Sequence, residues 1–506
     1  MKKLLLVLIA TVPVCAALLA QGQSARVAPD IYSQLRWRFV GPEGNRISAV
    51  VGVPGDPLVY YAGSASGGVA KTVDGGVHWQ QIFDEQSAQS IGSLAVAPSD
   101  PNIVWAGTGE AWIRSHISIG DGIYKSMDAG KTWTRMGLDK TGRIGRIVVD
   151  PTNSQIVLAC ALGTAYGPQP ERGVFRTTDG GATWQRTLFV DENSGCSEIA
   201  AHPSNPRILF AGMWQIEIHT WGRESGGPGS GLFMSRDGGA TWKKLEGHGL
   251  PTKPVGKVMP ATAHSNPNRV YATIETGDGI PWKGQETDRG QLWRSDDGGE
   301  NWRMVNADRN VLGRTAYYAR MAVSTDNDNE TYYLNASYSK SIDGGATLVP
   351  QTGLEAPGGD HHDMWVDPTN GNRMIVGHDQ GVSISQTRGR TWLKQRLPNA
   401  QLYHVTVPTN RMVRRTAVRA TAGSTKAAVA AAVAAAEEES RAACGMRLAA
   451  ARAASPLQTR SIRTSSGRLR PVRAASAASS SGTRRAGVSC AMSKSGRTTR
   501  MDRQRI

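Results

Sequence analysis

The last hundred residues of this 506-residue chain contain no aromatic side chain. The chain holds 14 Trp, 12 Tyr and 6 Phe, and all of them precede about Pro408. Residues 411–506 are rich in Ala, Arg and Ser and hold 20 Lys and Arg against 4 Asp and Glu. That excess equals the formal net charge of the whole chain, +16, so the residues before it are neutral overall. The excess of basic residues, which would normally suggest a nucleic-acid partner, is therefore confined to the tail. We expect no nucleic-acid partner for the residues before it.

Two interpretations of this tail, residues 408–506, remain open. A segment dominated by Ala, Arg and Ser and without aromatic side chains buries too little apolar surface to build a core, which is typical of a disordered low-complexity tail. Alternatively, the tail is a frameshifted reading of a gene that continues differently. Codons permitted by residues 455–467, read one frame away, can spell Asp-Pro-Asn-Ile-Val-Trp, which is the sequence at residues 100–105. We favour the frameshift, because it recovers a segment that the chain itself repeats.

Long apolar runs are also scarce. The run at residues 4–19 follows Lys2 and Lys3 and precedes small residues around 20–25. It is short for a membrane span and has the pattern of a secretion signal. We therefore predict a signal peptide over residues 1–25, no transmembrane segment, and export to the periplasm or the cell exterior. A lipoprotein site at Cys15 is the weaker alternative, because the residues before it fit poorly.

Cysteine is rare, and Cys160 and Cys196 are the only two of five that fall between the signal and the tail. An exported chain permits a disulfide, but the sequence favours two buried free thiols. HExxH and CxxC motifs are absent. The sequence therefore predicts no metal site of those kinds and no cofactor.

One short phrase recurs seven times, from TVDGGVHW at residues 72–79 to SQTRGRTW at residues 385–392. Its copies are 44 to 60 residues apart, the length of one four-stranded unit of a β-propeller. The aspartate can bond the backbone of a tight turn, and the glycines supply positive φ. We interpret the phrase as a structural Asp-box without chemistry of its own. Six copies keep the aspartate, at Asp74, Asp128, Asp179, Asp237, Asp297 and Asp343, and the last of these is weakened because Leu348 replaces its Trp.

A second repeat has the same register. A Pro, Asn or Asp turn followed by a β-rich run precedes each box, as in SDPNIVWAG and HPSNPRILFAG. Such runs are typical of half-buried strands. We predict an all-β fold: a propeller of about seven four-stranded blades over residues 26–407.

The boxes leave one face of the propeller free for function. Strands in a blade alternate in direction, so the loops between second and third strands and the loops that lead into each blade lie opposite the boxes. We call this surface the loop face. Loops on a rigid scaffold commonly carry binding sites, and aromatic rings beside carboxylates and Arg are typical of carbohydrate or peptide platforms. Weak catalytic candidates on it are Glu110, Asp121, Asp191, Glu217 and Asp360. Candidate ligand-binding residues are Trp112, Arg114, His116, Trp214, His219, Arg223, His361, His362 and His378. The alternative is that these residues form salt bridges and packing contacts within their loops.

The densest polar cluster is GGDHHDMWVDP at residues 358–368. Paired His with Asp could ligate a metal, but neighbouring residues on a strand point to opposite faces. At most one of His361 and His362 is then expected to face the central channel. We favour a histidine that bonds carboxylates there, with His378 and Asp379 nearby.

These motifs together resemble Asp-box (BNR-repeat) propellers, a class that includes sialidases, xyloglucan-degrading glycosidases and the sortilin ectodomain. GEAWIRSHISIGDGIYKSMDAGKTW at residues 109–133 and GDHHDMWVDP at residues 359–368 look like a bacterial exported group described as sortilin-like or glycosyl hydrolase. The resemblance covers residues 31 to 404. Members of that group usually continue into a second propeller, which this chain lacks and which a frameshift would remove.

The resemblance leaves the activity open. A sialidase is disfavoured, because the Arg-Ile-Pro motif of that family is absent. Xyloglucan-degrading enzymes resemble the chain in using two Asp-box propellers, with a carboxylate pair across the cleft between them. Our main prediction is an exported sortilin-like propeller that binds peptide, protein or glycan ligands on the loop face. The alternative is a glycoside hydrolase of the two-propeller type, with Asp or Glu as general acid and base, truncated here.

Overall fold

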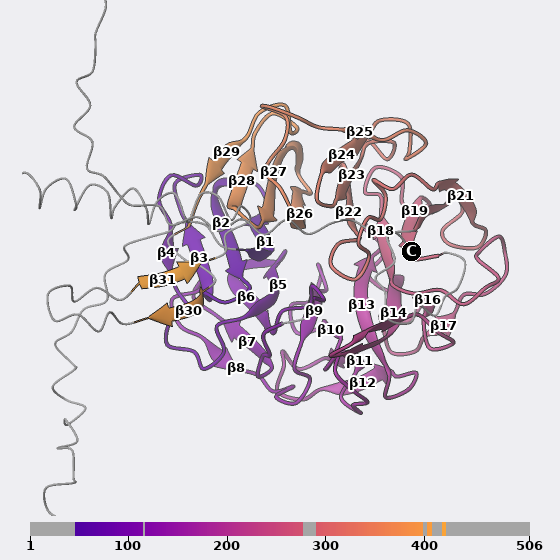
Figure 1. The fold of residues 1–506 in the computed structure, drawn as a ribbon, viewed down its shortest axis with the longest axis horizontal. Coiled ribbons are helices and arrows are strands. Elements are labelled where there is room, and N and C mark those ends of the chain that lie inside the picture. The colour runs from indigo at the N-terminus through magenta and orange to yellow at the C-terminus, as the bar shows by residue number, and fades with distance from the viewer. Residues whose placement is uncertain (1–45, 115–116, 277–289, 398–401, 407–416, 421–506) are drawn as a thin grey trace, which may run out of the picture. The chain divides into compact units, whose positions relative to one another are not determined.

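The computed structural model describes residues 46–114, 117–276, 290–397, 402–406 and 417–420. The predicted signal peptide, His116 and nearly all of the tail lie outside the described residues. The described residues form strands and loops without a helix, and they belong to one compact unit. The predicted all-β propeller is confirmed: seven antiparallel blades stand in a ring (Figure 1).

The strands follow the chain blade by blade. Blades one and two contain β1 (Ile47–Val53), β2 (Asp56–Ser64), β3 (Val69–Thr72), β4 (Gln80–Gln81), β5 (Ile91–Ala97), β6 (Asp100–Thr108), β7 (Ile123–Ser126) and β8 (Thr134–Arg135). Blades three and four contain β9 (Ile144–Val149), β10 (Val157–Ala161), β11 (Gly173–Thr177), β12 (Gln185–Leu188), β13 (Ser194–Ala201), β14 (Leu209–His219), β15 (Gly222–Ser225), β16 (Gly231–Ser235) and β17 (Lys243–Lys244). Blades five and six contain β18 (Val258–Thr262), β19 (Val270–Ile274), β20 (Gln291–Ser295), β21 (Arg303–Asn306), β22 (Arg320–Val323), β23 (Thr331–Leu334), β24 (Tyr338–Ser341) and β25 (Val349–Pro350). Blade seven contains β26 (His361–Asp367), β27 (Asn370–His378), β28 (Gly381–Ser385) and β29 (Leu393–Gln395).

Two features depart from the simple four-stranded repeat. In blade four, β14 runs past the blade and pairs with β15 as a hairpin, so that this sheet has five strands. Beyond blade seven, β30 (Leu402–Thr406) pairs with β31 (Ala417–Ala420). The second of these strands falls within the segment that we predicted to be a low-complexity tail.

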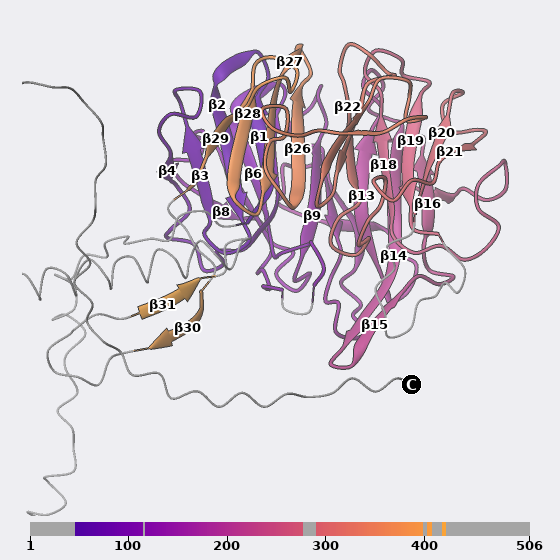
Figure 2. The same ribbon diagram turned by 45° about the horizontal axis from the view of Figure 1, so that its top comes forward.

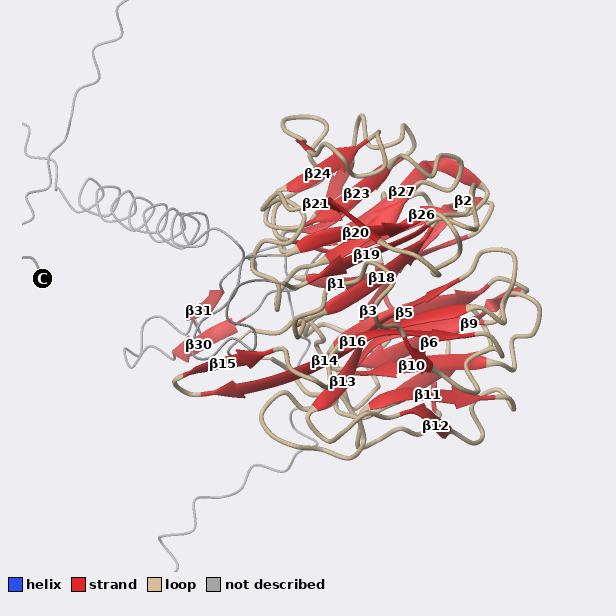
Figure 3. Cartoon of the chain, turned by 90° about the vertical axis from the view of Figure 1, so that its right-hand side faces the viewer, coloured by secondary structure: helices blue, strands red, loops and turns tan. Residues whose placement is uncertain are grey.

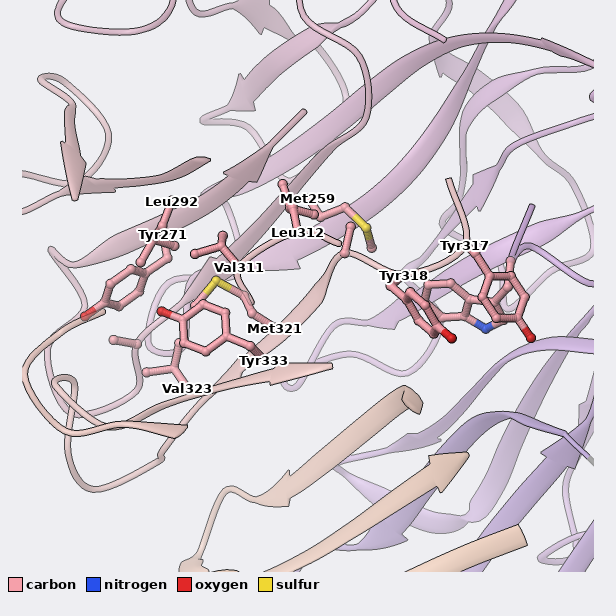
Figure 4. Packing of buried hydrophobic residues seen from close by; sticks show 13 residues of the cluster. Met259, Tyr271, Leu292, Val311, Leu312, Tyr317, Tyr318, Met321, Val323 and Tyr333 are labelled. Atoms are coloured by element: carbon pink, nitrogen blue, oxygen red, sulfur yellow. The ribbon is translucent and has the colours of Figure 1, made fainter. Parts of the chain in front are cut away.

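The hydrophobic core is divided into layers between successive blades. Between blades five and six, Met259, Tyr271 and Leu292 pack against Met321 and Tyr333 (Figure 4). Six further clusters of this kind fill the other junctions, the one between blades seven and one included. Each blade therefore buries both of its faces, and closing the ring removes apolar surface from water at every junction.

The box turns share one hydrogen-bond pattern. In blade three, Thr177 Oγ1 donates to Asp179 Oδ1 (2.7 Å) and accepts from the Gly181 N–H (3.0 Å). Asp179 Oδ1 also accepts from the Thr183 N–H (2.9 Å). In the seventh copy Thr387 replaces the aspartate, and its hydroxyl accepts from the Thr391 N–H (3.0 Å). The turn is therefore retained without the carboxylate, because the Thr387 hydroxyl accepts the backbone N–H hydrogen bond in its place.

In three blades, a Lys or Arg side chain on the third strand donates a hydrogen bond to the box of the next blade. Lys71 donates to Ala129 O, Lys125 to Gly180 O, and Arg176 to Gly238 O, over 2.8, 3.1 and 2.9 Å. Each donor directly precedes the Ser or Thr of its own box, and each acceptor lies in the following box. The repeat therefore forms a hydrogen bond between neighbouring blades as well as a turn.

The ring closes by direct packing of blade seven on blade one. Arg373 on β27 pairs with Asp367 and donates to the carbonyl oxygens of Val53 (2.6 Å) and Asp56. On the inner strands, the Val50 N–H donates to Asp363 Oδ2 (2.9 Å). In Figure 1, β1 accordingly lies beside β26 although the chain between them makes the full circuit.

Cys160 on β10 and Cys196 on β13 form a disulfide. Our prediction of two free thiols was therefore wrong. Sequence separation alone could not show that the second strand of blade three and the first strand of blade four bring these residues to 5.1 Å between Cα atoms.

Candidate functional site

Ion pairs cross the central channel. Arg320 on β22 donates to Glu198 on β13 (2.8 Å) and to Asp363 on β26 (2.7 Å). Arg146 on β9 binds both oxygens of the same Glu198 carboxylate. Burial would raise the pKa of Glu198, but the two guanidinium groups outweigh it and hold that pKa below its usual value. The channel is thus filled by charges from four blades that neutralise one another.

Trp112 lies within this centre and not on the rim. The Arg320 guanidinium stands 4.5 Å from its ring centroid, and its indole N–H donates to Ser48 O (2.9 Å). Its side chain is buried, in the same cluster as Tyr317 and Tyr318. Trp112 was predicted to bind ligand, but here it packs the core.

Glu110, a predicted catalytic candidate, is completely buried. Its carboxylate pairs with Arg46 and with Arg114 Nε (3.2 Å). Arg46 also donates to Asp379 Oδ1 over 3.1 Å. A carboxylate that is sealed from solvent and held by two guanidinium groups cannot contact a substrate, so Glu110 is better explained as a structural anchor of the loop face.

The two adjacent histidines point to different surroundings. His362 Nε2 lies 2.7 Å from Asp379 Oδ1, and its ring contacts Tyr317 and Tyr318 in the centre. His361 Nδ1 instead bonds Asn335 O (2.8 Å) between blades six and seven. Burial raises the pKa of Asp379, but the His362 bond and Arg46 lower it to about 2.

His361 and His378 are neutral at physiological pH. Burial is the main cause of both shifts, and it lowers the pKa of His361 to about 4 and that of His378 to about 3. His378 Nε2 bonds Ser383 Oγ over 3.0 Å. Both rings are buried, so neither presents a free nitrogen to solvent.

A strained loop before β22 carries the two tyrosines. Ala319 has a φ of +107°, and Asp360, which accepts the Tyr318 hydroxyl, has a φ of +58°. Lys257 supports this loop, because its Nζ donates hydrogen bonds to Ala316 O (3.3 Å) and Tyr318 O (3.0 Å). Strain of this kind persists only where the surroundings determine the conformation.

The other predicted carboxylates are engaged in their own loops. Asp121 accepts from Tyr124 OH (2.8 Å), and Asp191 caps the Asn193 N–H (2.8 Å). Glu217 lies 3.9 Å from His219 Nδ1 on the blade-four hairpin. The structure therefore unites Glu110 and Arg114 with His362 in one central network, and it leaves Asp121, Asp191 and Glu217 outside that network.

The hairpin β14–β15 presents an exposed aromatic pair. The His219 and Trp221 rings stack with 4.8 Å between centroids and 1° between planes, and Trp221 is 79 % exposed. Trp214 at the base is buried and donates to Ser225 Oγ (2.9 Å), while Arg223 donates to Ile113 O (3.4 Å). Figure 2 and Figure 3 show the β14–β15 hairpin projecting past the ends of the other blade strands.

A cavity of about 470 Å³ lies between blades four and five, beside the outer strand β17. It is lined by Leu232, Lys244, Leu250, Pro251 and Val255, among others. No predicted site residue lines it.

Sequence reasoning missed Arg46, Lys257, Tyr317 and the channel residues Glu198 and Arg320. A signal existed for the last two, because each is a charged residue in a short inner strand whose neighbours are small or apolar. Within the described ranges, no group of three His, Cys, Asp or Glu side chains is arranged to hold a metal ion. The same residues include no helix long and apolar enough to span a membrane.

Comparisons with known proteins show similarity to sortilin-like and glycosyl hydrolase β-propellers. The family model "Sortilin, neurotensin receptor 3" matches residues 121–250. A xyloglucanase of Hypocrea jecorina is 24 % identical over 361 residues, covering 63 % of this chain and 40 % of that protein. Xyloglucanase Xgh74A of Acetivibrio thermocellus is 26 % identical over 239 residues, covering 43 % of this chain and 26 % of its own length.

Solved structures agree at the level of the fold. The GH74 xyloglucanase from Xanthomonas campestris superposes with a TM-score of 0.54 at 17 % identity, over 74 % of this chain and 58 % of that one. The resemblance to sortilin-like and glycosyl hydrolase β-propellers is therefore confirmed. The chain spans less than half the length of the curated relatives named above. The comparisons also favour our alternative prediction, the glycoside hydrolase, over a sortilin-like binding propeller.

Proposed function

We propose that this chain is one propeller of a glycoside hydrolase of the two-propeller type and binds a polysaccharide on its loop face. The observation that carries the proposal is that the two curated relatives named above are xyloglucanases and that this chain covers 40 % of one and 26 % of the other. The uncovered part of such relatives leaves room for a second propeller. A β-linked glucan with side chains, as in xyloglucan, is the substrate class to test first.

Among the residues that the structure describes, the centre of the loop face offers no free carboxylate pair. Glycoside hydrolysis needs an acid and a base about 5 to 9.5 Å apart with access to the glycosidic bond. Glu110 and Asp379 both pair with the same guanidinium, Arg46. We therefore expect the chain to bind glycan and to leave hydrolysis to a site completed by carboxylates of another propeller.

A second candidate function is a propeller that binds a peptide or protein without catalysis. The ion pairs of Glu110 and Asp379 with Arg46 favour it, because a binding surface needs no proton-transferring carboxylate. Under either function, export to the periplasm or cell exterior fits the Cys160–Cys196 disulfide, since disulfides persist in oxidising compartments.

Binding and hydrolysis should be measured separately. Electrophoresis through gels containing xyloglucan, cellulose derivative or no polysaccharide measures binding, and reducing-end release measures hydrolysis. Retardation on the β-glucans without reducing ends would support the proposal. No retardation on any polysaccharide would contradict it and favour the peptide or protein ligand.

The proposed missing propeller has its own test. The gene should be resequenced across the codons for residues 400–420, and the frame should be restored if a base is missing or extra. The longer product is then expected to release reducing ends from xyloglucan. A clean sequence would make the basic tail genuine and would contradict the frameshift.

A further inference from the structure

The hairpin β14–β15 carries an exposed aromatic side chain, whereas the residues of the central network are buried or half-buried. Ile216 and Ile218 alternate along β14 and pack into a buried cluster with Ile113, Ala165 and Trp214. Because side chains on a strand alternate between two faces, Glu217 and His219 point to the opposite, outer face.

Several bonds hold the inner face of this hairpin in place. The Ile218 N–H donates to Ala165 O of blade three (2.6 Å). Ser225 Oγ, opposite Ile216, donates to the buried Glu275 of blade five (2.7 Å). The hairpin is thus fixed to the blades on both sides, and its outer face keeps a defined orientation.

The outer face carries an aromatic ring with carboxylates beside it. The turn residue Trp221 is 79 % exposed, and the His219 ring covers one face of its indole in a parallel stack. Glu217 pairs across the hairpin with Glu224, so both carboxylates lie on this side. Trp is an unusual residue for a two-residue hairpin turn, where Gly, Asn and Asp dominate, so turn chemistry does not explain its presence.

We propose that Trp221, backed by His219, is a sugar-stacking platform on which one pyranose ring of the polysaccharide lies, with Glu217 and Glu224 accepting hydrogen bonds from its hydroxyl groups. This inference rests on the proposed function and specifies where on the loop face the glycan is held. An indole offers a flat apolar surface to the C–H groups of a sugar ring, and carboxylates beside it accept from hydroxyls.

A sugar suits this surface better than a protein partner. A stable protein interface buries about 800 Å² per partner and has an apolar centre. The tip of the hairpin offers one aromatic platform surrounded by Glu217, Thr220 and Glu224, and Trp221 is its single strongly exposed large apolar side chain. The competing hypothesis is that a second propeller docks on this tip, and the test below distinguishes the two.

The test compares binding of xyloglucan oligosaccharides by the full chain and its variants, using calorimetry or affinity electrophoresis. W221A is expected to lose affinity about tenfold, H219A is expected to lose less, and W221F should retain part of the affinity. The matched control is I342A, because Ile342 is 71 % exposed in a box turn on the opposite face. All four variants should keep the melting temperature of the unmodified chain.

The outcomes separate the platform from the proposed function. If the unmodified chain binds glycan and W221A binds equally well, the platform is overturned while the function stands. If the unmodified chain binds no glycan, both are overturned. If W221A keeps its glycan affinity but weakens association with a separately expressed second propeller, the surface is a protein interface and the sugar platform is wrong.

Discussion

Arg320 donates a hydrogen bond to Glu198 over 2.8 Å, and this bond links the inner strand of blade six to that of blade four across the channel. Both side chains are almost fully buried. The hydrophobic layers join successive blades, whereas this ion pair joins two blades that are not neighbours in the ring.

Replacing Arg320 should destabilise the propeller strongly. In R320M, Glu198 and Asp363 lose a buried guanidinium partner, and removing one member of a buried pair costs about 3–5 kcal/mol. We expect a clear fall in the urea midpoint of unfolding. The matched control is R135A, because Arg135 is 49 % exposed in its ion pairs and such pairs contribute about 0–1 kcal/mol. Equal effects of the two substitutions would contradict the importance of the channel network.

Ring closure should depend on Arg373 and not on the tail. R373M removes the pair with Asp367 and the bonds to Val53 O and Asp56 O, so the junction between blades seven and one weakens. We expect it to lower the melting temperature by several degrees. Truncation after about Pro408 should leave the melting temperature unchanged. A truncated chain that melts several degrees lower would show that later residues take part in closure.

The disulfide should stabilise the junction of blades three and four. Cys160 and Cys196 are 36 residues apart in sequence, and closing a loop of that length removes about 4 kcal/mol of unfolded-state entropy. C160A/C196A, like reduction with dithiothreitol, should lower the urea midpoint. A reductant that has no further effect on the double variant would assign the loss to this bond. Peptide mapping without reductant should recover Cys160 joined to Cys196, and finding both as free thiols would disprove the pairing.

Stability should rise with pH between about 7 and 10 because of Lys257. Burial lowers the pKa of Lys257 from 10.5 to about 7. In that interval the unfolded chain binds this proton and the native chain does not, so the free energy of unfolding increases as pH rises. K257M should flatten the increase, whereas K131M, at an exposed lysine, should not. Parallel curves for K257M and the unmodified chain, measured by urea unfolding at several pH values, would show that Lys257 does not cause the rise.

The repeat pattern predicted the architecture because its signals are local. A turn of Asp and Gly and an alternating strand depend on residues a few positions apart, as between Thr177 and Thr183. Seven such units therefore predicted seven blades, and the weakened copy at Thr387 kept its turn through a hydroxyl.

The candidate site was predicted less well, because its properties depend on neighbours from distant blades. Loop membership assigned Glu110, Asp360 and His362 to one face of the propeller, but it did not show that Glu110 would be sealed by Arg46, 64 residues earlier. Trp112 and Trp214 are likewise buried, whereas Trp221 is exposed, although all three are loop-region tryptophans in the sequence. Exposure of a side chain is decided by which other blades cover it.

The sequence alone thus determined the all-β class, the blade count and the face on which loops gather, since each follows from short-range periodicity and turn chemistry. Only the tertiary structure decided that Cys160 meets Cys196, that Arg320 reaches Glu198, and that the β14–β15 hairpin holds Trp221 out in solvent. These contacts join residues 36 and 122 positions apart, or result from packing between blades. Long-range contacts of this kind are formed by closing the ring, and no local pattern encodes them.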